Sequence, residues 1–213
     1  VLALIGTGTQ SEFQALGFRA GLGITSLRVW DTDPAAMDKF IRNVEPLGFD
    51  IVRATSAADA AAGADIVTTC TADKKNATIL TADMIEPGMH LNAIGGDCPG
   101  KTELEEAIVR NSTVFVEFPE QTRIEGEIQQ LEADSPITEL WEVLAGTATG
   151  RSSAEEVTLF DSVGFAIEDF SALRYVFDAV RGTDYATNLD LIADPADPKD
   201  LFSLVARVPA LTA

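Results

Sequence analysis

VLALIGTGTQS, residues 1–11, is the stretch that decides the fold of this chain. Residues 1–5 form an apolar run of strand length, and Gly6 and Gly8 predict a sharp turn into a following helix. Backbone N–H groups at the start of such a helix favour binding of a pyrophosphate group. Ser11 replaces the third glycine of the dinucleotide-binding pattern GxGxxG, which predicts slightly wider spacing between helix and strand. A short glycine turn that binds nothing is the alternative interpretation.

The second predicted strand, residues 26–30, ends at Asp31, about 23 residues after Gly8. An acid at this position of a dinucleotide site accepts hydrogen bonds from the adenosine ribose. A 2′-phosphate would meet like charge there, and no arginine stands beside Asp31, so the sequence favours NAD over NADP. The alternative is that Asp31 only begins the turn that Asp33 completes.

Apolar runs of strand length alternate with helical patterns, which predicts a parallel sheet with crossover helices. The expected strands are residues 1–5, 26–30, 49–53, 65–69, 89–94, 112–117 and 156–160. The predicted fold class is α/β: a Rossmann-like doubly wound parallel sheet with helices on both faces, followed by a C-terminal helical segment.

Two early helices are expected between these strands. The first covers about residues 10–21, and its apolar Phe13, Leu16 and Phe18 are expected to face the sheet. The second covers about residues 34–46, with Asp33 as its N-cap and Pro34 at its first position. After residue 118 we expect two further helices, and then a long apolar helix at about 164–181.

GGDCPGKTEL, residues 95–104, places a carboxylate at the end of a buried strand, where Asp97 can meet a ligand. The two glycines let the backbone turn sharply and approach a bound molecule closely. Lys101 adds a cation, and Thr102 with Glu105 three residues later fits a capping box that opens the next helix.

This segment resembles the ornithine cyclodeaminase/μ-crystallin family, and more specifically its C-terminal nucleotide-binding part. FVEFPEQTRIEGEIQQL from Phe115 and TLFDSVGFAIEDFSALRYV from Thr158 also look like that family. The resemblance implies an NAD-dependent enzyme that converts L-ornithine into L-proline and ammonia. In that reaction hydride leaves the α-carbon, the δ-amine closes the ring, and the same hydride returns. Asp97 would act on the amine from a dry corner of the site.

The resemblance also implies roles for individual residues. Asp97 is the expected catalytic acid or base, and Asp97 and Val163 are the expected substrate contacts. Asp73 and Lys74 either bind or form a solvated turn. The expected NAD contacts are Gly6, Gly8, Thr9, Gln10, Asp31, Thr71, Ile94, Gly95, Gly96, Lys101 and Ser162.

Related activities remain as alternatives. The same superfamily includes alanine dehydrogenases and ketimine-reducing μ-crystallins, and a non-enzymatic nucleotide-binding protein is a further alternative. Asp97 followed by CPGKTEL resembles the cyclodeaminase branch. Cyclisation of lysine instead of ornithine stays open.

We expect two parts in the chain, an NAD-binding domain at 1–163 and a C-terminal helix and tail at 164–213. The sequence begins inside a strand, so we expect a missing N-terminal half that holds most of the substrate pocket and the homodimer interface. Apolar residues such as Phe170 and Leu173 predict that the long helix packs partly on that half.

Charge excludes some partners. The net charge of −19 argues against nucleic acid and anionic membranes, which need clustered Lys and Arg. No apolar stretch approaches the roughly 20 residues that a membrane span requires. Cys70 and Cys98 predict reduced thiols in a cytoplasmic protein.

Other residues that invite a catalytic interpretation are judged structural. His90, the single histidine, lacks a partner at ligand spacing, so we expect no metal site. Cys98 has no nearby histidine, and we expect it only to pack in the wall of the site beside Asp97. Glu117, Glu120, Glu125 and Glu127 are expected to form a solvated helix face.

Overall fold

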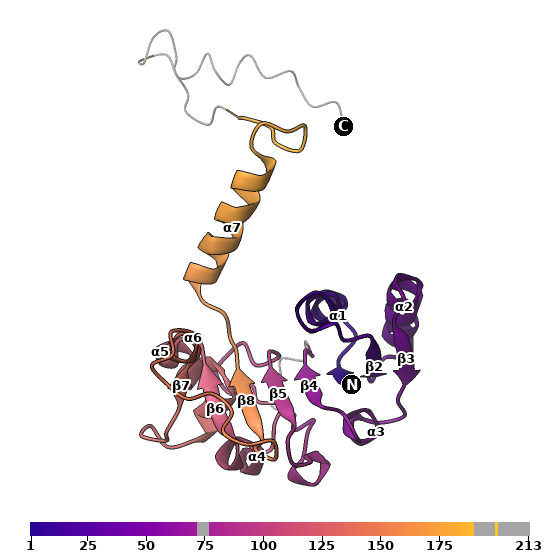
Figure 1. The fold of residues 1–213 in the computed structure, drawn as a ribbon, viewed down its shortest axis with the longest axis vertical. Coiled ribbons are helices and arrows are strands. Elements are labelled where there is room, and N and C mark those ends of the chain that lie inside the picture. The colour runs from indigo at the N-terminus through magenta and orange to yellow at the C-terminus, as the bar shows by residue number, and fades with distance from the viewer. Residues whose placement is uncertain (72–76, 190–198, 200–213) are drawn as a thin grey trace. The chain divides into compact units, whose positions relative to one another are not determined.

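The computed structural model describes residues 1–71, 77–189 and 199 of the 213-residue chain. Its centre is a parallel sheet of eight strands in the order β3-β2-β1-β4-β5-β8-β6-β7 (Figure 1). The strands are β1 Leu2–Ile5, β2 Ser26–Trp30, β3 Asp50–Arg53, β4 Ile66–Thr69, β5 His90–Ala93, β6 Thr113–Val116, β7 Thr138–Glu139 and β8 Thr158–Asp161. The α/β prediction is confirmed, and only the two-residue β7 was missed, because no apolar run marks it.

The strand order reverses between β1 and β4. From β1 the chain adds β2 and β3 on one side, then returns to place β4 on the other side of β1. Every pairing in this sheet is parallel, so the carboxyl ends of the strands lie at one edge. The loops that leave β1 and β4 therefore diverge there, which is the usual ligand position in an open parallel sheet.

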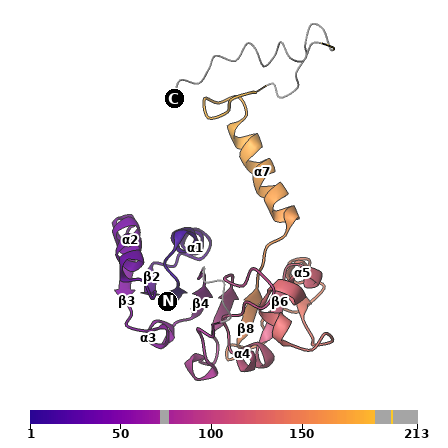
Figure 2. The same ribbon diagram turned by 180° about the vertical axis from the view of Figure 1, so that it is seen from behind.

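Helices cover both faces of the sheet, as Figures 1 and 2 show. Alternate residues of each strand face opposite sides. Leu2 and Leu4 pack with the side of α1 and α2, whereas Ala3 and Ile5 pack with the side of α3 and α4. The helices are α1 Thr9–Leu22, α2 Pro34–Val44, α3 Ala57–Ala61, α4 Glu106–Asn111, α5 Pro119–Glu125, α6 Leu140–Leu144 and α7 Ala166–Val180, with 3₁₀ turns η1 Glu45–Leu47, η2 Ala82–Met84 and η3 Glu127–Gln130.

Helix α1 packs on the sheet through a different face from the one expected. Phe13 is 64% exposed and Leu16 is 39% exposed, whereas Ser11 and Ala15 are fully buried. Small residues at these two positions bring the first turns of the helix close to the sheet, and Phe18 joins the same core. The side-chain assignment for Phe13 and Leu16 was therefore wrong.

Helix α2 begins as the sequence predicts. The Asp33 carboxylate accepts a hydrogen bond from the backbone N–H of Ala35 at 2.9 Å, and Pro34 is the first helical residue. This cap starts α2 immediately after β2, beside Asp31.

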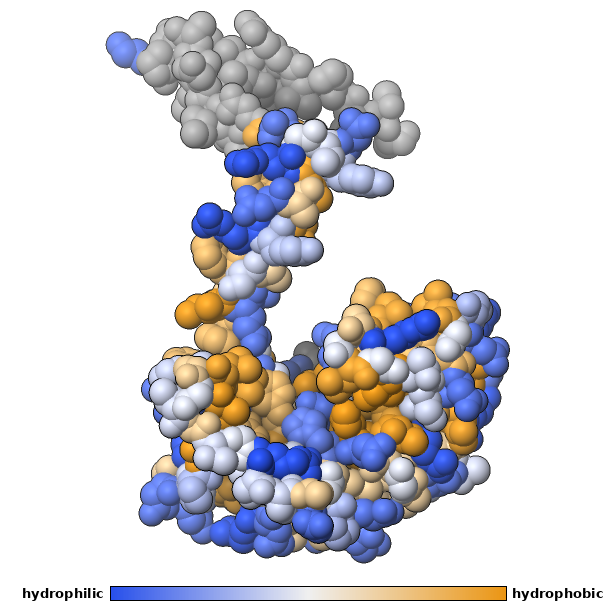
Figure 3. Space-filling view, in the orientation of Figure 1, coloured by the Kyte–Doolittle hydropathy of each residue, from blue (hydrophilic) through white to orange (hydrophobic). Residues whose placement is uncertain are grey.

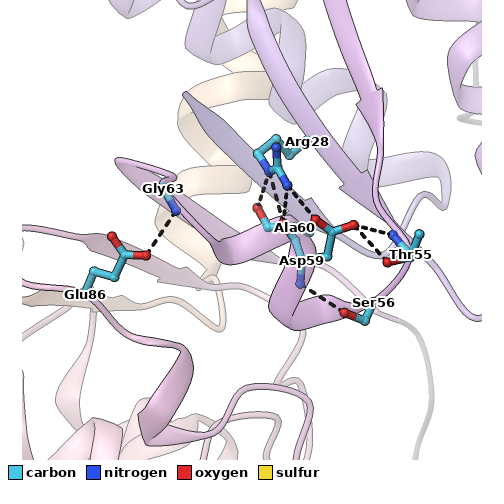
Figure 4. Close-up of polar contacts among 7 residues, drawn as sticks. All are labelled: Arg28, Thr55, Ser56, Asp59, Ala60, Gly63 and Glu86. Atoms are coloured by element: carbon cyan, nitrogen blue, oxygen red, sulfur yellow. Dashed lines mark hydrogen bonds and ion pairs between the residues drawn. The ribbon is translucent and has the colours of Figure 1, made fainter.

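Helix α3 is tied to β2 by Arg28, as Figure 4 shows. The Arg28 guanidinium donates to the backbone oxygens of Asp59 and Ala60 and to the Asp59 carboxylate at 2.7 Å. A cation beside the last carbonyls of a helix is favourable. Asp59 also accepts bonds from Thr55, so one carboxylate holds both Arg28 and the entry to α3.

The predicted capping box at Thr102 and Glu105 does not form. Glu105 is the N-cap of α4, but its carboxylate accepts a bond from the backbone N–H of Ala82 at 2.7 Å. Residues 101–104 stay non-helical, and Leu104 bridges to Leu80. The Glu105 carboxylate thus makes a tertiary contact with Ala82 instead of the predicted local capping hydrogen bond.

The chain divides into two units, Val1–Ala166 and Ile167–Ala213. In the second unit, α7 carries exposed apolar side chains, which Figure 3 shows interspersed with polar ones along the helix. These are Ile167, Phe170, Leu173, Val176 and Phe177. Within the described part of the chain, no helix has the length and apolar character needed to cross a membrane.

Candidate nucleotide-binding and catalytic edge

The turn after β1 depends on two glycines with different surroundings. Gly6 has a φ of +96°, and a Cβ atom there would lie 2.8 Å from the Cys70 carbonyl oxygen. Only glycine fits this conformation and this space. Gly8, in contrast, faces open space, so a bound molecule can approach the backbone there.

Helix α1 starts at this turn without a side-chain cap. Its N-cap is Gly8, so the N–H groups of its first turn, which begins with Thr9 and Gln10, are left for a ligand or water. The Ser11 hydroxyl donates to the Gly8 carbonyl oxygen at 2.7 Å. Ser11 thus braces the glycine turn, a role that the GxGxxG comparison did not anticipate.

Asp31 fixes the same turn from the end of β2. One of its oxygens accepts bonds from the Thr7 N–H at 2.6 Å and from the Thr7 hydroxyl at 3.0 Å. The other oxygen accepts from the Asp33 N–H at 2.9 Å. Asp31 therefore does shape the turn toward α2, and its predicted contact with a ribose stays a prediction.

A cleft of about 370 Å³ lies over the junction of β1 and β4, where the strand order reverses. Its volume lies within the range that holds small-molecule ligands and parts of cofactors. The lining residues come from the end of β2, the start of α2 and the segments that follow β1, β2 and β4: Gly6, Gly8, Trp30, Asp31, Thr32, Asp33, Ala36, Cys70, Thr71, Ala77 and Ile79.

The segment 95–104 brings Asp97 and Lys101 to the same edge. Lys101 is buried, with 2% of its side chain exposed, and its Nζ contacts the Thr71 carbonyl oxygen at 3.2 Å and the Asp97 Oδ1 at 3.3 Å. Because Thr71 also lines the cleft, Lys101 links Asp97 to the cleft wall. The predicted proximity of these three residues is therefore present.

The environment of Asp97 differs from the one expected. Its side chain is 62% exposed, so the described residues do not enclose it in a dry corner. The reason is local: Asp97 lies in an irregular loop beside Pro99 and Gly100, and its carboxylate contacts the buried Lys101.

The Glu103 carboxylate occupies the space beside Gly95, where the sequence predicted a contact with NAD. A Cβ atom on Gly95 would overlap the Glu103 carboxylate, so this glycine admits Glu103. The Thr71 hydroxyl donates to Glu103 Oε1, and Lys101 Nζ lies 3.9 Å from the same oxygen. The sequence interpretation missed Glu103, although Lys101 and Glu103 two positions apart share one side of an extended segment.

Glu127 and Asp161 form a buried framework behind this segment. Glu127 accepts bonds from the N–H groups of Glu103 at 2.7 Å and Leu104 at 3.1 Å. Asp161 accepts from the N–H groups of Glu127 and Ile128, both at 2.9 Å. Asp161 therefore fixes the backbone of Glu127, and Glu127 in turn fixes the backbone of Glu103, which lies beside Lys101.

Burial sets the proton affinity of these two acids. Desolvation raises the pKa of Glu127 to about 8, with the charges of Asp161 and Glu103 adding to it. Desolvation likewise raises the pKa of Asp161 to about 6. The expectation of a solvated helix face was wrong for Glu127, because that residue lies past the end of α5 and faces the core.

The loop after β8 brings Ser162 and Val163 to the same carboxyl edge. Glu117 accepts bonds from the Ser162 hydroxyl and from the N–H groups of Val163 at 3.1 Å and Gly164 at 3.0 Å. The Glu117 carboxylate therefore binds the loop after β8, whereas the sequence predicted that it would lie on a solvated helix face.

The cysteines and the histidine have ordinary structural surroundings. Both Cys70 and Cys98 are free, as expected for reduced thiols. Burial, followed by the charges of Glu103 and Asp31, raises the pKa of Cys70 to about 12. His90 contacts Thr158 at 2.7 Å, and burial lowers its pKa.

Most of the predicted site residues thus come from loops at one edge of the sheet. Ile94 is half-buried at the end of β5, and Gly96 is buried beside the Glu125 carbonyl oxygen. Asp73 and Lys74 lie outside the described residues. The structure adds the buried acids Glu103, Glu127 and Asp161 and the half-buried Glu117 behind this edge.

The sequence profile of the ornithine cyclodeaminase/mu-crystallin family matches residues 1–184. This chain belongs to that family. The ornithine cyclodeaminase of Agrobacterium fabrum is 59% identical over 206 residues, which cover 97% of this chain and 58% of that relative. The chain therefore spans less than two thirds of the relative's length.

Solved structures of the family share the fold. An archaeal alanine dehydrogenase dimer with bound NAD has a TM-score of 0.82 at 30% identity, covering 90% of this chain and 61% of its own. A lysine cyclodeaminase, studied for its recognition of L-lysine, L-ornithine and L-2,4-diaminobutyric acid, has a TM-score of 0.79 at 31% identity. That match covers 95% of this chain and 59% of the cyclodeaminase. The family assignment made from the sequence is confirmed.

Proposed function

We propose that this chain is the nucleotide-binding part of an NAD-dependent ornithine cyclodeaminase that converts L-ornithine into L-proline and ammonia. The observation that carries the proposal is 59% identity over 206 residues to an ornithine cyclodeaminase. The edge geometry supports it, because Asp97, Lys101 and Thr71 are linked beside the cleft over the glycine turn.

The described residues fit NAD as the cofactor. Gly8 leaves open space at the start of α1, where the uncapped N–H groups suit a pyrophosphate. Asp31 lies in the cleft wall, where its carboxylate suits a ribose hydroxyl and opposes a 2′-phosphate. The alanine dehydrogenase structure of the family holds NAD. When bound, NAD supplies reversible hydride transfer at this edge.

Asp97 is the proposed catalytic residue. Its exposed carboxylate is accessible to an incoming amine, and its contact with Lys101 Nζ fixes its position beside the cleft. An alkylammonium group has a pKa near 10.4, so ring closure requires a group that takes a proton from the δ-nitrogen. Asp97 would accept that proton and orient the amine.

The other predicted contacts have supporting positions. Lys101 and Thr71 are joined at the cleft wall, which suits a role in holding the cofactor. Ser162 and Val163 are fixed by Glu117 at the carboxyl end of β8, next to β5. We propose that Ser162 contacts the nicotinamide side and that Val163 contacts the substrate.

Assembly and location are further parts of the proposal. We propose a homodimer, as the bound form of the archaeal relative is a dimer. The exposed apolar side chains of α7 would pack on a further domain that completes the substrate pocket. The two free cysteines are in keeping with the cytoplasm.

Cofactor binding can be tested through Trp30, which lines the cleft. The chain has two tryptophans, so Trp141→Phe leaves Trp30 as the single indole. NAD should quench its fluorescence saturably, and NADP should do so only at much higher concentration. Equal affinity for both nucleotides would contradict the role of Asp31.

The activity test uses the full-length protein with L-ornithine and trace NAD, and measures proline and ammonia. We expect many turnovers per NAD without accumulation of reduced cofactor. Stoichiometric NADH without proline would indicate an amino-acid dehydrogenase instead. Intact NAD binding without turnover of ornithine or lysine would indicate a binding protein.

A further inference from the structure

The ammonium group of Lys101 is a buried cation that needs a negative partner. Its side chain is 2% exposed, and an unpaired charge at such a depth is costly. Two carboxylates face it among the described residues, Asp97 at 3.3 Å and Glu103 at 3.9 Å. The Asp97 side chain is 62% exposed, whereas that of Glu103 is 2% exposed. Water therefore solvates Asp97, whereas Glu103 shares the burial of Lys101.

The proposed chemistry makes this distinction important. When Asp97 takes a proton from the δ-ammonium of L-ornithine, its carboxylate becomes a neutral carboxylic acid. The δ-nitrogen becomes an amine with a free electron pair. If Asp97 were the single counterion, that step would leave the buried Lys101 ammonium uncompensated, which would oppose the proton transfer.

We propose that Glu103 is the fixed counterion of Lys101 and a positioning residue, which leaves Asp97 free to take and return a proton. This inference rests on the proposed function for the role of Asp97. The pairing of Glu103 with Lys101 rests on geometry alone and can be tested without activity.

The surroundings of Glu103 hold its carboxylate in place. Gly95 provides the space that a side chain would otherwise fill. The Thr71 hydroxyl donates to Oε1, the oxygen that faces Lys101. Glu127 binds the backbone N–H of Glu103 at 2.7 Å. These contacts come from three different segments, so Glu103 keeps its position when a ligand meets Asp97.

The first experiment measures the melting temperature of the full-length protein in a double-mutant cycle. Glu103→Gln and Lys101→Met should each lower Tm, and the double variant should lose clearly less than the sum of the two losses. The cycle of Asp97→Asn with Lys101→Met should be closer to additive, because Asp97 is solvated. Additive losses for Glu103 and Lys101 would overturn the pairing.

Poor folding of Glu103→Gln would also be informative. If Lys101→Met restores folding in the double variant, the lost counterion explains the defect and the proposal stands. If Lys101→Met folds alone and the double variant does not, Glu103 has a separate structural role and the proposal fails.

The second experiment measures the pH profile of ornithine turnover. In Glu103→Gln, Asp97 becomes the single counterion of Lys101, so the acidic limb of the kcat profile should move to lower pH. At neutral pH, kcat should fall at least about tenfold, with KM for ornithine changed less than about threefold. Glu103→Asp, which keeps the charge, should recover part of kcat.

The control is Glu106→Gln, which removes an exposed acid from α4 that pairs with Arg110. It should leave both Tm and the pH profile near wild type. An unshifted acidic limb in Glu103→Gln, or equal loss of kcat in Glu103→Asp, would overturn the inference. Absence of proline formation by the wild type would instead contradict the proposed function, and the Tm cycle would still test the pairing.

Discussion

The glycine turn and the segment 95–104 lie at the same edge of the sheet, but they are built differently. The glycine turn depends on backbone shape, since Gly6 fits where a Cβ atom cannot, and Asp31 braces it from the next strand. The segment 95–104 depends on side chains from distant parts of the chain. Glu127 binds the backbone of Glu103 across 24 residues of sequence, and Asp161 in turn binds the backbone of Glu127 across 34 residues.

Under the proposed function, this difference separates two tasks. A nucleotide needs N–H groups and open space, which a short local motif provides. Proton transfer needs a carboxylate beside a fixed charge, and fixing a buried charge requires a framework of further buried groups. Variants in the first region should therefore change cofactor affinity, and variants in the second should change turnover.

The largest effect is expected for Asp97→Asn, which keeps the shape of the side chain and removes its ability to take a proton. Turnover of L-ornithine by the full-length protein should fall by about 10²- to 10⁴-fold. NAD affinity, measured by isothermal titration calorimetry, should stay within about twofold. Asp134→Asn, at an exposed turn, is the matched control. Retained turnover in Asp97→Asn would show that another group carries the proton.

Gly6→Ala should be the most damaging change in the glycine turn. The positive φ and the overlap with the Cys70 carbonyl oxygen predict a loss of about 2–4 kcal/mol in the free energy of unfolding, measured by urea denaturation. Gly8→Ala is the matched variant, because a Cβ atom there meets open space. It should lower stability by about 1 kcal/mol or less, because alanine is a poorer N-cap than glycine, and still weaken NAD binding. Equal stability losses would contradict this division.

The buried acids predict how stability depends on pH. Their pKa values are raised in the folded chain, to about 8 for Glu127 and about 6 for Asp161, so the folded state holds more protons. The stabilisation is complete at pH values below the pKa values of the two acids in the unfolded chain. It is lost as pH rises through the folded pKa values, about 6 for Asp161 and then about 8 for Glu127.

Urea denaturation at pH 5 and pH 8 measures this effect. The free energy of unfolding of the wild type should fall by at least about 1 kcal/mol from pH 5 to pH 8. The free energy of unfolding of Glu127→Gln should fall less over the same range. Gln retains an acceptor for the N–H of Glu103 but does not titrate. An equal pH dependence in wild type and variant would show that Glu127 ionises as readily as in water.

Asp31→Asn should weaken NAD binding by about tenfold or more, which corresponds to loss of a charge-assisted hydrogen bond. The relative affinity for NADP should rise, since like charge no longer opposes a 2′-phosphate. Asp38→Asn, an exposed position on α2 that pairs with Arg53, serves as the control. Unchanged discrimination between the nucleotides would place the ribose elsewhere.

The smallest effect is expected on the outer face of α1. Phe13→Ser should change the free energy of unfolding by less than about 0.5 kcal/mol, because Phe13 is exposed. Phe40→Ala, in the buried core under α2, should cost about 3–5 kcal/mol. A large loss for Phe13→Ser would mean that α1 packs through its aromatic face after all.

Sequence patterns predicted those parts of the fold that depend on neighbours in the chain. Apolar runs marked seven of the eight strands, and Asp33 with Pro34 marked the start of α2. The orientation of α1 was wrong because burial favoured small residues, Ser11 and Ala15, over the more apolar Phe13. Hydrophobic character alone does not reveal how closely a helix approaches a sheet.

For the candidate site, the sequence likewise predicted the position of its loops but not the buried contacts behind them. The gathering of the candidate residues at one edge followed from strand ends, which parallel pairing brings together. Glu103 and Glu127 were missed because a glutamate is usually solvated, and their partners come from segments far away in sequence. Such contacts leave no periodic signal, so a single sequence cannot separate a buried acid from a surface one.

The most direct test of the account follows deuterium at the α-carbon of L-ornithine through the full-length protein with trace unlabelled NAD. If the same hydride leaves and returns, the α-deuterium will be found at the α-carbon of L-proline, with no net accumulation of reduced cofactor. Proline without the label, or deuterium accumulating in reduced NAD while no proline forms, would contradict it.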